Sequence, residues 1–146
     1  MIIDPKPLWQ KHRSKVRKFC GVNRKVYIQY INEVPDETII SSCFYDTIYC
    51  FLPMLTMKNL NRVVKRIPEI NTPEKQIIFL LAHEMQHAKQ FEDGVVYPFI
   101  SRRGNVLVKW HGKTFRKTME YDDYPWETDA NTMALAYVRS FFQIRS

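Results

Sequence analysis

Several features are missing from the sequence, and each absence excludes a class of protein. No stretch of its 146 residues reaches the roughly 18 consecutive apolar residues that a membrane-spanning helix needs. The first residues show no basic segment followed by an apolar one, so we expect no secretory leader. The three cysteines form no Cys-x-x-Cys pair, which argues against a disulfide framework and against a cysteine-based zinc site. We therefore expect a cytoplasmic protein without membrane contact.

Repeats, low-complexity tracts and Gly/Ser linkers are also missing, so the chain should form one packed unit. What is present supports folding, because 45% of the residues are hydrophobic and 14% are aromatic. Such a chain can bury enough apolar surface to offset the entropy lost on ordering. We expect a single domain over residues 1–146.

Positive charge exceeds negative charge, with 22 Lys and Arg against 15 Asp and Glu and a net charge of +7. The basic residues gather at positions 11–18 and 102–117. This charge would suit nucleic acid or an acidic protein, whereas the simpler interpretation is a solvated basic surface. We favour the simpler one, because no nucleic-acid-binding motif accompanies the charge; His12, within the first cluster, should be a surface side chain.

Hydrophobic periodicity predicts a strand-rich first half and a helical second half, which is an α+β fold. A small antiparallel sheet should pack on a buried helix and on a C-terminal helix. The expected helices are 8–19, 58–66, 73–91 and 125–143, and the expected strands are 25–31, 38–44, 47–52, 95–100 and 105–110. The last two strands flank Ser-Arg-Arg-Gly and should form a hairpin.

The helix predicted at 73–91 carries the clearest local signals. Thr72 supplies a side-chain oxygen for an N-cap, Pro73 fits the first helical position, and Glu74 complements the helix dipole. Apolar residues leave few polar faces on the helix, and Gly94 ends it. We expect this helix to be the buried spine of the fold.

The segment His83-Glu84-Met85-Gln86-His87 lies in the second half of that helix. At 3.6 residues per turn, His83 and His87 share a face and can bind one metal ion. A catalytic Zn²⁺ site uses three protein ligands and leaves one position open. Glu84 would accept a proton from the attacking water. The alternative is a pair of histidines that serve core polar groups or face solvent; we favour zinc, because the helix is apolar and well capped.

A third ligand is needed, and Glu127 at the start of the last helix is the strongest candidate. A carboxylate in a first helical turn is rigidly held, and the small Ala130 one turn later would let two helices approach closely. Asn131 lies on the same face at i+4 and could orient a ligand histidine through its second nitrogen.

These residues resemble a known family. His-Glu-x-x-His followed by Glu-x-x-Ala-Asn at 127–131 resembles the Glu-zincin metallopeptidases, in which two histidines and a downstream helical glutamate bind zinc. Residues 108–115 and 124–127 are similar to small phage-encoded metallopeptidase-like proteins, and His-Gly-x-x-Phe at 111–115 resembles the SprT-like family. The resemblance covers residues 72–138 and, for a phage protein, implies the cytoplasm of the bacterial host.

The two resemblances imply different third ligands. The Glu-zincin pattern implies Glu127, whereas SprT-like proteins use a downstream histidine, which would be His111. We favour Glu127, because His111 ends a predicted strand, where its side chain can readily face substrate or solvent instead of a metal ion. Asp129 is a weaker choice, since it projects from a different face of the helix.

The leading hypothesis is a zinc peptidase that hydrolyses peptide bonds of a peptide or protein substrate, with Glu84 as the catalytic base. His111, Tyr121 and Tyr124 are candidates to donate a hydrogen bond to the oxyanion. The alternative is a zinc-binding factor with weak or no catalysis that binds nucleic acid or protein, and an intermediate hypothesis is a SprT-like protease recruited to DNA by its basic surface.

Overall fold

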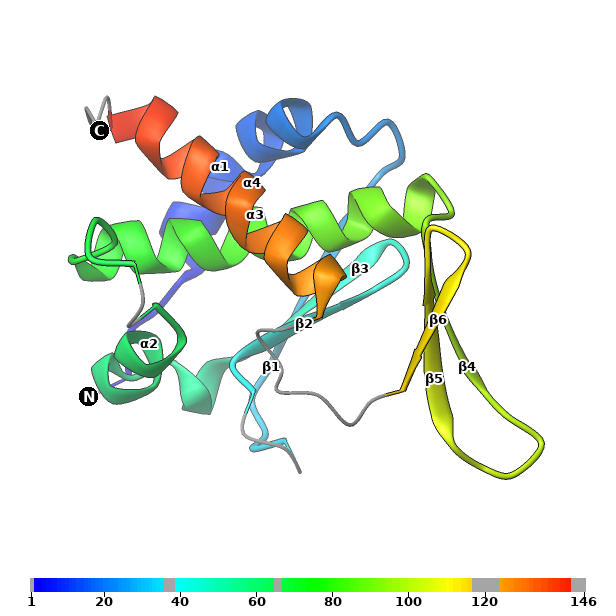
Figure 1. Cartoon of the computed structure of the whole chain (residues 1–146). Helices are drawn as coiled ribbons and strands as arrows, with labels where there is room; N and C mark the ends of the chain where they lie inside the picture. The colour runs from blue at the N-terminus through cyan, green and yellow to red at the C-terminus, as the bar shows by residue number, and fades with distance from the viewer. Residues whose placement is uncertain (1, 36–38, 65–66, 117–123, 143–146) are drawn as a thin grey trace.

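The computed structural model describes residues 2–35, 39–64, 67–116 and 124–142 and has the predicted α+β class (Figure 1). The helices are α1 (Lys6–Cys20), the 3-10 helix η1 (Leu52–Met54), α2 (Met57–Val64), α3 (Pro73–Glu92) and α4 (Pro125–Phe142). The strands are β1 (Tyr27–Ile31), β2 (Ser41–Phe44), β3 (Thr47–Phe51), β4 (Val96–Ile100), β5 (Val106–Trp110) and β6 (Lys113–Arg116). Within the described ranges, no helix combines the length and apolarity needed to cross a membrane.

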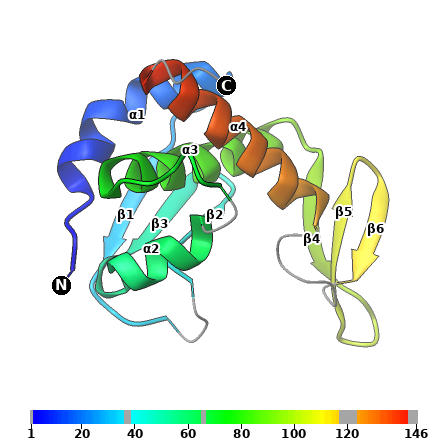
Figure 2. The same cartoon turned by 60° about the vertical axis from the view of Figure 1, so that its left-hand side comes forward.

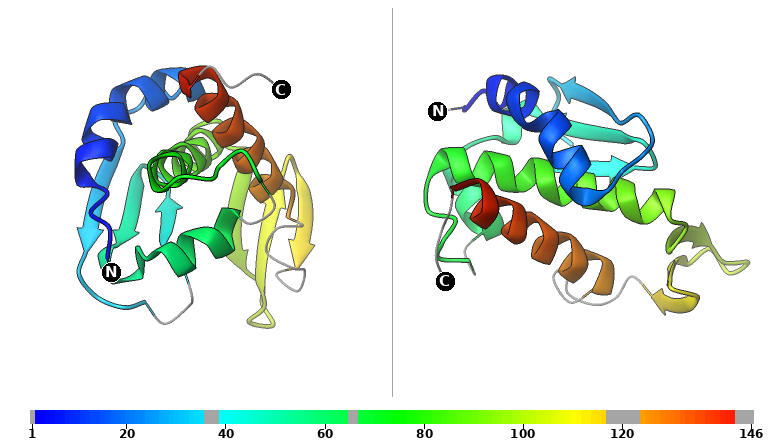
Figure 3. Two further views of the ribbon diagram at one scale, coloured as in Figure 1. Left: turned by 90° about the vertical axis from the view of Figure 1, so that its left-hand side faces the viewer. Right: turned by 90° about the horizontal axis from the view of Figure 1, so that it is seen from above.

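Helix α3 is the buried spine that its sequence predicts. Thr72 caps it, because its hydroxyl oxygen accepts a hydrogen bond from the Lys75 amide at 3.2 Å. Every residue from Gln76 to Ala88 is buried. Seen end-on in Figure 3, α3 is surrounded by α1, α2, α4 and the first sheet. The helix can therefore hold buried polar side chains in fixed positions.

The first sheet corrects the expectation of a purely antiparallel arrangement. Its order is β1-β3-β2, in which β2 pairs antiparallel with β3 but β1 pairs parallel with β3. After β1 the chain forms β2, which does not pair with β1. The turn at Tyr45 and Asp46 then leads into β3, which lies between β1 and β2 and pairs with both. Residue alternation specifies that a segment is a strand, but not which neighbour it pairs with. As a result β2 is an edge strand, and it lies against α3.

The second sheet has the order β4-β5-β6 and projects from the C-terminal end of α3 (Figures 1 and 2). The β4–β5 hairpin was predicted, and Gly104 in its loop has a φ of 81°. Strand β6 was not predicted. It follows a turn in which both His111 and Gly112 have positive φ. A small apolar cluster of its own joins this sheet to the start of α4: Val96, Val108, Tyr124 and Trp126.

The prediction that His12 lies on the surface is wrong. His12 is fully buried, and its Nδ1 lies 2.8 Å from the hydroxyl oxygen of Tyr137. The reason is amphipathicity: Trp9, His12 and Val16 share the face of α1 that enters the core, whereas the basic residues cover the other face. Burial, followed by the nearby charges of Lys11 and Lys15, lowers the pKa of His12.

The contact between α3 and α4 depends on small side chains. Ala134 is fully buried on α4, whereas Ala136 is exposed on the same helix. We expect Ala134→Leu to lower the free energy of unfolding by about 1–3 kcal/mol, because a larger side chain would push the helices apart. Ala136→Leu should change it by less than about 0.5 kcal/mol. Urea unfolding of both variants is the measurement, and equal stabilities would contradict the packing described.

Candidate metal site

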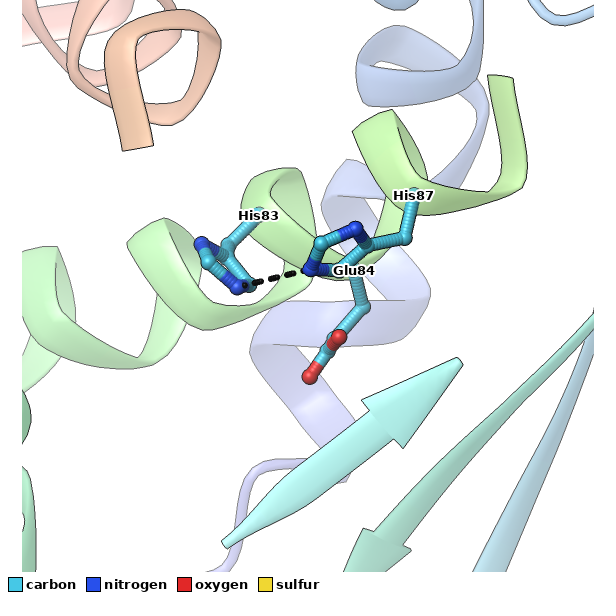
Figure 4. Close-up of side chains that lie close together, drawn as sticks. All are labelled: His83, Glu84 and His87. Atoms are coloured by element: carbon cyan, nitrogen blue, oxygen red, sulfur yellow. Dashed lines mark hydrogen bonds between the residues drawn. The ribbon is translucent and has the colours of Figure 1, made fainter. Parts of the chain in front are cut away.

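His83 and His87 lie one turn apart on α3 and point to a common position (Figure 4). Both residues are buried, and their Nε2 atoms are 3.1 Å apart. Each imidazole is oriented by a hydrogen bond at its other nitrogen, Nδ1. The two Nε2 atoms therefore have fixed directions, as metal ligands require.

Glu127 completes this arrangement from the first turn of α4. Its carboxylate oxygens lie 3.0 Å from Nε2 of His83 and 3.1 Å from Nε2 of His87. The carboxylate comes this close because α4 packs along α3 with Ala130 fully buried one turn after Glu127. Bonds of about 2.0–2.2 Å would place the ligand atoms of a tetrahedral zinc site about 3.3–3.6 Å apart. The spacing of these three groups, 3.0–3.1 Å, is slightly shorter than that range.

Gln90 fixes the tautomer of His87. The Gln90 amide nitrogen donates to the carbonyl oxygen of Trp126 and to a carboxylate oxygen of Asp129, each at 2.9 Å. Both partners are acceptors only, so the nitrogen and oxygen of the Gln90 amide cannot be exchanged. Its oxygen, 2.8 Å from Nδ1 of His87, must then accept a hydrogen bond from the N–H at that nitrogen. In the neutral imidazole, Nε2 of His87 consequently presents a lone pair.

Asn131 performs the same task for His83. Its side-chain oxygen lies 2.8 Å from Nδ1 of His83 and accepts a hydrogen bond from the N–H there. Nε2 of His83 therefore presents its lone pair to the same position as Nε2 of His87. The two supporting amides come from different helices, Gln90 from α3 and Asn131 from α4.

The electrostatics of the three converging groups call for a cation. Burial alone would raise the pKa of Glu127, but the adjoining imidazoles hold that pKa well below its usual range. Burial lowers the pKa of His87, yet Glu127 outweighs it and raises this pKa to about 9. A single proton shared among the three groups can form only one hydrogen bond, so their other close contacts remain without one. Oε2 of Glu127 is accordingly buried without a hydrogen bond. A metal ion would satisfy all three contacts, so these residues can hold one.

Glu84 is also buried and belongs to the same constellation. His83, Glu84 and His87 each offer a ligand-type atom, and these atoms lie within 4.8 Å of one another. The oxygens of Glu127, at 3.0 and 3.1 Å from the histidine nitrogens, add a further ligand-type group beside this triad. Figure 4 shows the Glu84 carboxylate turned toward the neighbouring strand, where the Ser41 hydroxyl donates to its Oε2 at 2.6 Å.

The remaining predicted site residues lie elsewhere. His111 is exposed in the β5–β6 turn with a φ of 48°, and its ring contacts that of Trp110, with centroids 4.5 Å apart. Tyr124 is buried, stacks on Trp126 and lines a cavity beside the site. Asp129 accepts hydrogen bonds from Gln86 and Gln90 rather than facing the histidines. Tyr121 lies outside the described residues.

Two residues of the site were not anticipated from the sequence. Gln90 follows His87 by three residues on the same helix, so the i+3 rule could have nominated it. Ser41 had no local signal, because it is 43 residues away from Glu84 along the chain. Only the pairing of β2 at the sheet edge brings them together.

Comparison of the chain with models of protein families, with curated proteins and with solved structures gives no match. The residues and their geometry alone indicate a possible metal site: a buried His83-Glu84-His87 constellation on α3 with Glu127 from α4.

The role of Gln90 can be tested by removing its hydrogen bonds without changing its size much. We expect Gln90→Met to weaken zinc binding by about 10- to 100-fold, because His87 loses the partner that fixes its tautomer. Gln86→Met is the matched control, since Gln86 also donates to Asp129 but serves neither histidine in the contacts described. Competition with a fluorescent chelator measures both affinities. An equal loss in the two variants would show that Asp129, and not the orientation of His87, matters.

Proposed function

We propose that this protein is a zinc-dependent peptidase. The observation that carries the proposal is the convergence of three buried acceptor groups, from His83, His87 and Glu127, at 3.0–3.1 Å from one another. Two imidazole nitrogens and one carboxylate form a donor set that suits zinc, and three protein ligands leave one position open for water or substrate. When bound, the zinc ion would polarise a carbonyl group and lower the pKa of water.

In this proposal Glu84 is the general base. Its carboxylate lies beside the ligands rather than among them, and the bond from Ser41 fixes one carboxylate oxygen. From this position Glu84 can take a proton from the attacking water and deliver it to the leaving amine. A purely structural zinc site would have no need of such a carboxylate, because protein ligands would close the fourth position.

The edge strand β2 supports a peptide as the substrate. Phe44 and Thr47 flank the two-residue turn and pair with each other, and Ser42 pairs with Tyr49 two residues on. By the alternation of an antiparallel ladder, the backbone groups of Ser41 and Cys43 then face outward. An extended peptide can pair with these groups, and its backbone would then run beside His83, His87 and Glu127. The oxyanion roles of His111, Tyr121 and Tyr124 stay predictions.

The metal assignment is tested by counting zinc in purified variants. We expect wild-type protein to bind one zinc ion per chain and Glu127→Gln to lose tight binding, because an amide cannot replace the negative ligand. His111→Ala should bind zinc as the wild type does, since this residue lies in the exposed turn. Elemental analysis after dialysis is the measurement. Zinc lost from His111→Ala and kept by Glu127→Gln would reverse the assignment.

The catalytic assignment is tested by Glu84→Gln. We expect this variant to keep its zinc but to hydrolyse fluorogenic casein about 10²- to 10⁴-fold more slowly, because the general base is gone. Glu74→Gln is the control, since Glu74 is exposed in the first turn of the same helix. Unchanged hydrolysis by Glu84→Gln would remove Glu84 from the mechanism. Zinc-loaded wild type that cleaves neither casein nor a random peptide library would refute the peptidase proposal.

A further inference from the structure

A cavity of about 290 Å³ opens directly beside the candidate metal site. It lies between the end of β2, the last turns of α3 and the β4–β5 hairpin. Its polar groups include Glu84, His87 and Glu127, which are the residues of the site itself. The rest of the lining is dominated by apolar and aromatic side chains: Phe44, Phe91, Val96, Val108, Tyr124 and Trp126. The cavity is therefore polar where the chemistry would occur and apolar beyond it.

The hairpin adds an apolar face that continues out of the cavity. Residues paired across an antiparallel ladder point to the same side, so Pro98 and Val108 share a face with the pair Ile100 and Val106. Val108 is buried against the body, whereas Ile100 is 73% exposed and Val106 is 48% exposed. Apolar surface that begins inside a cavity and remains uncovered outside it is typical of a binding face.

We propose that this cavity binds one bulky apolar side chain of an extended polypeptide, next to the peptide bond that is cleaved. The position of the cut rests on the proposed peptidase function, whereas the binding of the side chain does not. The occupant is a segment of an unfolded or extended protein chain with an exposed aromatic or large aliphatic residue.

The shape of the cavity favours a peptide side chain over a larger free ligand. Its volume is at the lower end of the range for small-molecule pockets, about 300–1,000 Å³. Ser42, Cys43 and Phe44 of the edge strand form one wall. A peptide paired with that edge directs alternate side chains to opposite faces, so one of them can enter the cavity while its backbone stays beside the site.

The chemistry of the walls sets the preference. A charged side chain would lose its hydration among the apolar walls without gaining a partner there. A Phe or Leu side chain gains from the same burial, and the gain corresponds to about a tenfold to hundredfold increase in affinity.

The binding test uses the full-length, zinc-loaded Glu84→Gln variant, so that peptides bind without being cut. The probes are fluorescein-labelled decapeptides of Gly and Ser with one central Phe, Leu or Asp, and fluorescence anisotropy measures their affinity. We expect the Phe and Leu peptides to bind about tenfold or more tightly than the Asp peptide. Equal affinities for all three would overturn the proposal.

Two further substitutions in that background locate the binding. Val106→Trp places an indole at the mouth of the cavity and should abolish the preference for Phe over Asp. Thr114→Trp adds the same group to an exposed position on the opposite face of the sheet and should leave the preference intact. If Val106→Trp does not fold, as judged by circular dichroism, Val108→Ala should enlarge the cavity and shift the preference from Leu toward Phe. A preference unchanged in the folded cavity variant would refute this location.

Cleavage mapping separates this proposal from the peptidase function. The wild-type protein is incubated with denatured casein, and the cut sites are identified by mass spectrometry. Cuts that cluster beside Phe, Leu, Met or Tyr would support both proposals. Cuts without such a preference would refute the binding of an apolar side chain in the cavity but would support the peptidase function. Peptide binding that favours Phe, with no cuts at all, would keep the cavity and refute the peptidase.

Discussion

The crossing of α4 over α3 is the contact on which the site depends. His83 and His87 are positioned by α3 alone, and the first turn of α4 brings the carboxylate of Glu127 within 3.0–3.1 Å of both. Ala130 and Ala134 of α4 are fully buried, and their small side chains permit a close approach of α4 to α3. A small increase in helix separation would leave two histidines and a carboxylate too far apart to share one ion. Packing of small residues therefore determines whether His83, His87 and Glu127 lie close enough together to bind one ion.

The same crossing is held together by polar groups that also orient the ligands. Asp129 of α4 accepts hydrogen bonds from Gln86 and Gln90 of α3, and Gln90 also donates to the Trp126 carbonyl oxygen. The oxygen of the same Gln90 amide accepts from His87. Gln90 thus links the two helices and also fixes the tautomer of His87. The contact between the helices and the orientation of this imidazole therefore depend on the same side chain.

Local signals in the sequence predicted much of this arrangement. The cap at Thr72 and the spacing of His83 and His87 depend only on neighbouring residues, so they could be read directly. Glu127 and Asn131 were nominated by their spacing on the last helix. The bond from Ser41 to Glu84 and the parallel pairing of β1 with β3 could not be predicted, because both depend on which segment fills the centre of the first sheet. His12 was misjudged because the charges of its neighbours concealed the buried stripe of α1.

The length of α3 explains why the candidate metal site and the apolar cavity adjoin. Its 20 residues extend for about 30 Å, from the first sheet to the second. His87 and Phe91 are one turn apart on it, a rise of about 6 Å, which is within the reach of one side chain. The rigid helix therefore fixes the distance between the group that would hold a metal and the wall that would select a side chain. Phe91 contacts Phe44 and Tyr45, so aromatic side chains of α3 and of the β2–β3 hairpin form this wall together.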